Sequence, residues 1–131
     1  MKIAFLCTGA LGLLLFCLSM LVSYHRLSKR QALGPGEDPK GPLSKACIAQ
    51  SNTAQYAPML AVLMITLQIY GSPNWLVWVS TAAVLGRYLY AAAILTAEDP
   101  RKFSPLKATG VGLTYVSGAL MSLALFVQAM R

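Results

Sequence analysis

Four long apolar runs, separated by short polar segments, dominate the sequence of this 131-residue chain. They cover residues 3–24, 47–70, 75–96 and 108–130. A helix needs about 20 apolar residues to cross the hydrocarbon core of a bilayer, because each residue adds about 1.5 Å along the helix axis. Each run is long enough to do so. The pattern therefore predicts an all-α integral membrane protein, a four-helix bundle that forms a single domain over residues 1–131.

The first run could instead be a cleaved signal peptide. Its apolar stretch exceeds the length of about 7 to 15 residues that is usual for signal peptides. No small-x-small cleavage site precedes residues 24–26. We therefore expect a helix that is retained.

Helix-breaking residues mark the connections between the runs. Glycine and proline recur between residues 34 and 42, and residues 72–74 should form a tight turn. Pro100 should end the third helix, because proline disfavours helical geometry in the residue before it. Inside the second run, Pro58 should free the carbonyl of Ala54 and bend the helix.

The positive charges gather in two of the three connections. The net charge is +7, but no basic patch with interleaved aromatic residues points to nucleic acid. The first and third connections are basic, whereas residues 71–74 carry no charge. The basic residues in or beside the two connections are Arg26, Lys29, Arg30, Lys40, Lys45, Arg101, Lys102 and Lys107. By the positive-inside rule, both connections should lie on the cytoplasmic side and both termini on the opposite side.

One charged residue, Arg87, lies inside an apolar run. A charge at this depth is costly, so the side chain should face the bundle interior, a water-filled cleft or another subunit, and it is a functional-site candidate. A structural bond to backbone carbonyls or to a polar residue of another helix is an equally good explanation. Four short helices should not bury Arg87 well within one thin bundle, and small residues recur on the helix faces. We therefore predict a homotrimer with polar clefts at the subunit interfaces.

Two polar stripes accompany this charge. On the second helix, four residues with i, i+4, i+7 and i+8 spacing share a face: Ile48, Asn52, Gln55 and Tyr56. On the third helix, Arg87, Tyr90 and Ile94 form a similar stripe, which Arg101 would continue if the helix extended that far. The stripes should form a cleft that opens beside the first and third connections and attracts anions. Alternatively, Asn52 and Gln55 only bond neighbouring helices.

The three cysteines, Cys7, Cys17 and Cys47, lie in or beside the apolar runs. Because the chain has a single histidine and no CxxC motif, no metal site is predicted. We expect all three to serve packing, and only Cys47, at a membrane boundary, merits a test of reactivity.

Several of these residues together resemble the MAPEG family, the membrane-associated proteins in eicosanoid and glutathione metabolism. The resemblance covers nearly the whole chain and includes a basic end to the first helix. Its motif residues are Asn52, Gln55, Tyr56 and Pro58 in the second helix, Arg87 and Tyr90 in the third, and Arg101 after it.

The resemblance implies a glutathione-dependent transferase or peroxidase whose sites lie between the subunits of a trimer. Arg101 matches the family's thiolate-stabilising arginine and would be the catalytic residue. The residues that would bind glutathione are Arg30, Asn52, Gln55, Tyr56, Arg87 and Tyr90. The activated sulfur would attack an apolar electrophile or reduce a lipid hydroperoxide that arrives from the bilayer.

The chain also departs from the family pattern. Ile48 and Gln55 replace an arginine and a glutamate of the second helix, Ile94 replaces a tyrosine of the third, and Gln31 replaces a basic residue beside Arg30. The cleft therefore lacks a carboxylate for the ammonium group of glutathione. Since a hydrogen bond to a charged partner contributes about 1.5 to 3 kcal/mol and a neutral one about 0.5 to 1.5, affinity for glutathione could fall tenfold or more.

Two other classes of function remain open. A non-catalytic subunit of a larger membrane complex would keep the fold and lose ligand-binding residues. A small ion-coupled transporter usually needs a carboxylate within the membrane, whereas all four acidic residues, Glu37, Asp38, Glu98 and Asp99, lie in the connections. The transporter is therefore the least favoured reading.

Overall fold

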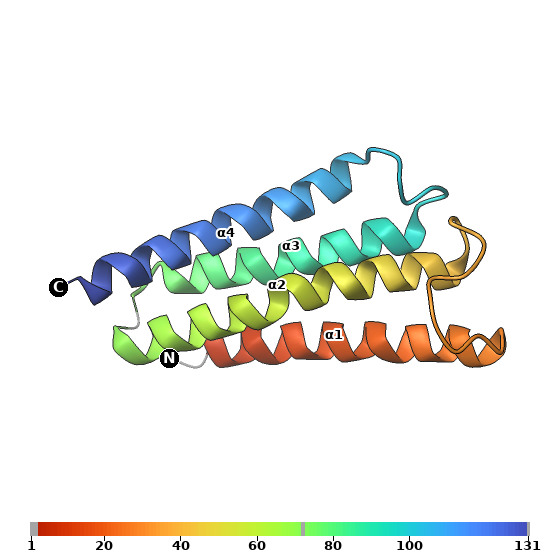
Figure 1. Ribbon diagram of the computed structural model, residues 1–131. Coiled ribbons are helices and arrows are strands. Elements are labelled where there is room, and N and C mark those ends of the chain that lie inside the picture. Colours follow the sequence, from red (N-terminus) through yellow and green to blue (C-terminus); the bar gives the residue numbers. More distant parts are fainter. Residues whose placement is uncertain (1–2, 72, 131) are drawn as a thin grey trace.

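The computed structural model describes residues 3–71 and 73–130. Within these ranges the chain forms four helices and no strand: α1 (Ile3–Ser28), α2 (Pro42–Tyr70), α3 (Leu76–Thr96) and α4 (Pro105–Ala129). The helices lie side by side, with the start of α1 and the end of α4 at one end of the bundle and the α1–α2 and α3–α4 connections at the other (Figure 1). The all-α prediction is confirmed.

The helices extend beyond the apolar runs at their polar ends. α1 continues past Tyr24, and α2 begins at Pro42 rather than at Cys47. Hydropathy marks only the part of a helix that suits the hydrocarbon core, whereas its backbone hydrogen bonds can continue into the polar interface. Pro42 and Pro105 stand in the first turns of α2 and α4, where a missing N–H costs no helical hydrogen bond.

The α2–α3 and α3–α4 connections can be compared with the sequence prediction where they are described. α3 ends at Thr96, before Pro100, as expected. The predicted turn at residues 72–74 includes Ser72, which lies outside the described residues. Beside it, the Leu76 N–H donates to the Pro73 carbonyl at 2.9 Å and closes the entry into α3.

Three helices, α1, α3 and α4, are long and apolar enough to cross a membrane. The chain is therefore an integral membrane protein. α2 does not meet the same criterion of apolarity, because several polar residues interrupt its sequence. It nevertheless runs alongside α1 and α3 (Figure 1), which shields part of its surface. That α2 also crosses the bilayer remains a prediction.

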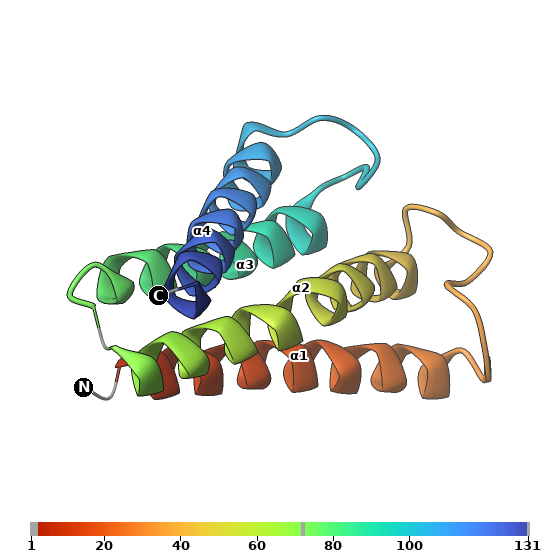
Figure 2. The ribbon, with the colours of Figure 1, turned by 60° about the vertical axis from the view of Figure 1, so that its left-hand side comes forward.

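The helices pack as two close pairs, α1 with α2 and α3 with α4, which Figure 2 shows from a second direction. Pro58 lies inside α2, and the axis of this helix changes direction near its middle (Figure 1), as its sequence predicts. Small and aliphatic side chains fill the interior, among them Leu11, Met64, Leu67, Leu76 and Met121.

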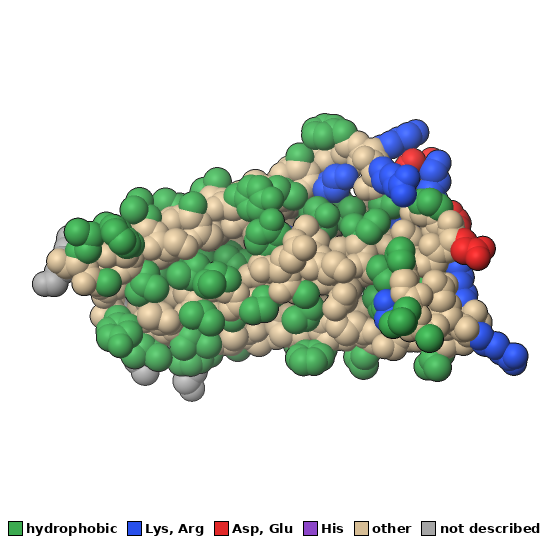
Figure 3. All heavy atoms as spheres, viewed as in Figure 1, with side chains coloured by type: hydrophobic (Ala, Val, Ile, Leu, Met, Phe, Trp, Pro, Cys, Tyr) green, Lys and Arg blue, Asp and Glu red, His purple; other side chains and the backbone are tan. Residues whose placement is uncertain are grey.

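Charged side chains gather at the end that carries the two long connections, and hydrophobic side chains cover much of the remaining face seen in Figure 3. Large apolar side chains such as Phe16, Trp78 and Phe126 are exposed on the single chain. Such a surface needs lipid or another protein against it. The molecule thus has a charged, polar end and an apolar body (Figure 3).

Candidate functional site

Arg87 of α3 is the centre of a polar cluster between α2 and α3. Its side chain is only 1% exposed within the single chain. The sequence-based expectation that one bundle could not bury this residue well is therefore wrong. Polar and aromatic side chains from α2, which the sequence pattern alone could not orient, enclose the guanidinium.

Neutral groups accept some of the hydrogen bonds that the Arg87 guanidinium can donate. Its Nη2 donates to Asn52 Oδ1 at 2.7 Å and to Thr53 Oγ1 at 3.3 Å. The guanidinium carbon lies 5.3 Å from the ring centre of Tyr56 and 5.0 Å from that of Tyr90, within the range of cation–π attraction. Its Nε is buried and has no hydrogen-bond partner among the described residues. Arg87 thus bonds to polar residues of another helix. This structural bond was one of the two explanations that the sequence allowed for it.

The two polar stripes meet only in part. Tyr56 turns toward α4, where its hydroxyl lies 3.0 Å from that of Tyr115. Asn52, Gln55 and Tyr90 instead line a groove of about 530 Å³ at the polar end of the bundle. Tyr56 is therefore outside the lining of this groove in the single chain, although its ring lies 5.3 Å from the Arg87 guanidinium carbon.

The groove lies between the end of α1, the α1–α2 connection and the first half of α2. Its complete lining is Arg26, Gly34, Pro35, Cys47, Ile48, Gln50, Ser51, Asn52, Gln55 and Tyr90. One of these side chains is charged, two are glutamines, and none is a carboxylate. The groove can therefore receive an anion, and it offers neutral amide and hydroxyl groups to the remainder of a polar ligand.

Two arginines predicted for the site lie outside this groove. Arg101 is exposed in the turn after α3, where its backbone N–H donates to Asp99 Oδ1 at 3.0 Å. It does not continue the α3 stripe, because that helix ends at Thr96. Arg30 is exposed beyond the end of α1.

Arg26 takes the place in the groove that was expected of Arg30. It lies in the last turn of α1, and its Nη2 donates to the Gly34 carbonyl at 3.5 Å. A sequence signal for it did exist. The apolar residues Leu14, Leu18 and Val22 recur every four residues in the sequence, and Arg26 is the next position in that series.

An ion pair joins the two connections at the polar end. Lys40 Nζ lies 3.3 Å from Asp99 Oδ2. The bond from the Arg101 backbone N–H lowers the pKa of Asp99 below its ordinary value of 3.8, and Lys40 lowers it further against the opposing effect of partial burial. The pair links the α1–α2 connection to the α3–α4 connection.

The cysteines and acids provide no metal site among the described residues. Cys7 is buried, as expected of a packing residue, whereas Cys17 is exposed on the single chain. Cys47 is partly buried and lines the groove.

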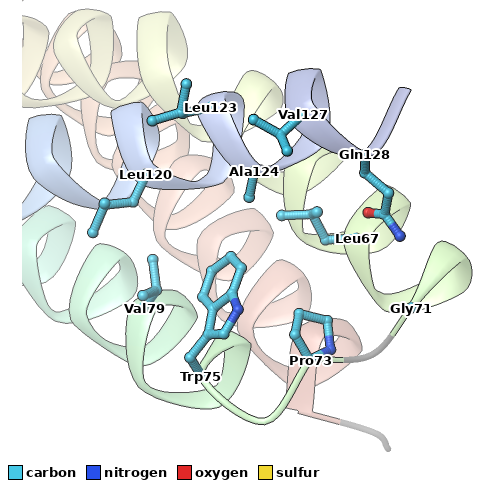
Figure 4. A pocket seen from close by; sticks show the side chains of 10 residues that line it. All are labelled: Leu67, Gly71, Pro73, Trp75, Val79, Leu120, Leu123, Ala124, Val127 and Gln128. Atoms are coloured by element: carbon cyan, nitrogen blue, oxygen red, sulfur yellow. The ribbon is translucent and has the colours of Figure 1, made fainter. Parts of the chain in front are cut away.

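A second cavity, of about 670 Å³, lies between α2, α3 and α4 at the opposite end of the bundle (Figure 4). Apolar side chains such as Leu67, Leu120 and Val127 provide most of its wall. At its edge, the Gln128 amide donates to the Tyr70 carbonyl at 2.9 Å. No charged residue lines it, so it does not suit the anionic ligand that the groove could bind.

Comparison with known proteins adds one finding. The sequence model of the MAPEG family matches residues 4–127, nearly the whole chain. No curated protein and no solved structure matches this chain.

Proposed function

Because this chain belongs to the MAPEG family, we propose that it is a membrane-embedded, glutathione-dependent enzyme of the transferase or peroxidase kind. The observation that carries the proposal is the groove at the polar end. It combines the positive charge of Arg26 with the side chains of Asn52, Gln55 and Tyr90. Arginine binds carboxylates through paired hydrogen bonds, and glutathione has two carboxylates.

The enzyme would work by activating the thiol of glutathione. A free thiol has a pKa of about 8.5, so it is mostly protonated at neutral pH. A nearby guanidinium favours the thiolate by about 1.36 kcal/mol for each unit by which it lowers the pKa. In this proposal Arg101 has that role, and the thiolate attacks an apolar electrophile or a lipid hydroperoxide from the bilayer.

The remaining residues would position the ligand. Asn52, Gln55 and Tyr90 contact it in the groove, whereas Arg87 acts through its bonds to Asn52 and its contact with Tyr90. Arg101 and Arg30 are exposed outside the groove of their own chain. In the proposed homotrimer, the site is therefore completed where the exposed arginines of one subunit meet the groove of a neighbour.

The test is the absorbance of bound thiolate at neutral pH, measured on the purified protein with saturating glutathione. Wild type should show the signal, and Arg101→Ala should remove it with little effect on folding, because the residue is exposed in a turn. Lys102→Ala, a neighbouring exposed change of the same charge, should keep it. A wild type that binds glutathione without any thiolate signal would refute thiolate activation.

A second candidate function is a non-catalytic subunit of a larger membrane complex. It is favoured by the neutral partners of Arg87, which need no ligand, and by the neutral residues Ile48 and Gln55 in the groove. A glutathione titration of the purified protein distinguishes the two candidates, since the structural subunit should not bind it.

A further inference from the structure

The groove has an unbalanced charge. Arg26 is the one charged side chain that lines it. All four acidic residues of the chain, Glu37, Asp38, Glu98 and Asp99, are absent from its wall. A second cation, Arg87, lies directly behind the wall, where it contacts both Asn52 and Tyr90.

Arg26 has unused capacity to bind an anion. A guanidinium carries five N–H donors. The single hydrogen bond found for it in the described part of the chain is the long one, 3.5 Å, to the Gly34 carbonyl. Its Nε also has no partner among the described residues, but this atom is buried, so the donors at the end of the side chain are the ones a ligand would use. A carboxylate in the groove would supply acceptors that the protein does not.

The same wall offers little to a cation. Asn52 Oδ1, a good acceptor, is already bonded to Arg87 at 2.7 Å. The ring of Tyr90, which could attract a cation, already has the Arg87 guanidinium carbon 5.0 Å from its centre. Gln55 provides a neutral carbonyl, which is a weaker partner for an ammonium group than a carboxylate would be. An ammonium group in the groove would lose its water and gain two arginines as neighbours.

We propose that the groove binds a carboxylate ligand that lacks a free ammonium group, with Arg26 as its anchor. Given the proposed function, the ligand class is a thiol peptide like glutathione whose α-amino group is absent or acylated. Arg26 would bind the carboxylate, and Gln55 would face the neutral position where glutathione has its ammonium group. Gln55 would hydrogen-bond there only when that position is an acylated amide. This deepens the proposed function, since it concerns the ligand of the same groove.

The test compares two thiol peptides that differ in this group alone. Glutathione is titrated against glutaryl-cysteinylglycine, in which hydrogen replaces the ammonium group, using the purified oligomer in mild detergent. Wild type should bind the analogue about tenfold more tightly than glutathione. An ammonium group that lacks an oppositely charged partner in the groove should weaken binding by about that factor. Gln55→Glu should reverse the preference, since it restores a carboxylate for the ammonium.

Variants of the anchor test the role of Arg26. Arg26→Gln should weaken both peptides about tenfold or more, and Arg26→Lys should restore part of the affinity because it keeps the charge. Lys29→Gln is the matched control. It removes an exposed charge in the next turn of the chain and should change neither affinity. Size-exclusion elution and melting temperature show whether each variant is folded.

The preference between the two peptides shows which of the two proposals fails. If wild type prefers glutathione, the inference is wrong while the proposed function stands. If it binds the analogue but not glutathione, the inference holds and the glutathione-dependent function fails. If neither peptide binds, both fail. If Arg26→Gln behaves like Lys29→Gln, Arg26 is not the anchor and the proposal is overturned.

Discussion

At the scale of single residues, Arg87 shows how a permanent charge is kept inside the bundle without a carboxylate. Its guanidinium stays protonated in proteins, and an isolated buried charge is strongly unfavourable. Here Asn52 and Thr53 accept hydrogen bonds, and the rings of Tyr56 and Tyr90 lie within cation–π range of it. These contacts join α3 to α2 and shape the inner wall of the groove.

The bond between Arg87 and Asn52 should therefore support folding strongly. We expect Asn52→Leu to lower the free energy of unfolding by about 1.5 to 3 kcal/mol, the usual contribution of a hydrogen bond to a charged group. Thr53→Val should have a smaller effect, because the Thr53 contact is longer, at 3.3 Å. Unfolding in mixed detergent and denaturant measures both. Equal losses in the two variants would contradict this ranking.

At the scale of the elements, one glycine contact sets the distance between α3 and α4. A Cβ atom added to Gly110 would lie 2.7 Å from the Gly86 carbonyl oxygen and 2.8 Å from the Tyr90 backbone nitrogen. No side chain fits between backbones at this distance. The contact lies beside Tyr90, so α3–α4 packing also holds one wall of the groove in place.

Gly110→Ala should consequently push the two helices apart. We expect a loss of about 1 to 3 kcal/mol in the free energy of unfolding, the usual cost of overpacking. Gly118→Ala is the control on the same helix, because its Cβ would lie at an ordinary 3.6 Å from Leu60. That change should be neutral or slightly stabilising, since alanine favours helix more than glycine does. Melting temperatures of the two variants in the same detergent should differ clearly, and similar values would count against the close contact.

At the scale of the whole molecule, charge is separated from the apolar body. Charged side chains gather at one end of the molecule (Figure 3), where the ion pair between Lys40 and Asp99 links the two basic connections. A carboxylate whose pKa is lower in the folded than in the unfolded state stabilises the folded state above its unfolded pKa. That stabilisation is lost as the pH falls through the folded pKa.

For Asp99 this predicts a loss of stability in acid. The difference in melting temperature between wild type and Asp99→Asn should be constant above about pH 5 and disappear as the pH falls well below 3.8, the ordinary pKa of the carboxyl. Glu98→Gln, an exposed neighbouring change, should show no such difference. A difference for Asp99→Asn that persists in strong acid would argue against an electrostatic link between the connections.

The predicted homotrimer also belongs to this scale. The need to bury Arg87 no longer supports a trimer, because the single chain already buries this residue. The trimer is supported by the exposed apolar surface and by Gly9, Gly12 and Gly112, where an added Cβ would meet no atom within 4 Å. Such small-residue faces allow helices of different chains to approach closely. Light scattering in mild detergent should give the mass of three chains, and a monomeric mass over a range of protein concentrations would refute the prediction.

The sequence by itself determined the number of helices, their approximate bounds, the bend at Pro58 and the gathering of positive charge at one end. These features depend on local properties: the length of an apolar run, the missing N–H of proline and the composition of each connection. It also indicated that Arg87 must be enclosed, because the cost of exposing a charge to lipid does not depend on the identity of its neighbours.

Only the tertiary structure decided which side chains meet. It paired Arg87 with Asn52, turned Tyr56 toward Tyr115, and brought Arg26 rather than Arg30 or Arg101 into the groove. A shared face on one helix does not predict the partner across the interface. The partner depends on the rotation and bend of each helix and on the path of the connections. Those are properties of the packed bundle, which no single segment of the sequence contains.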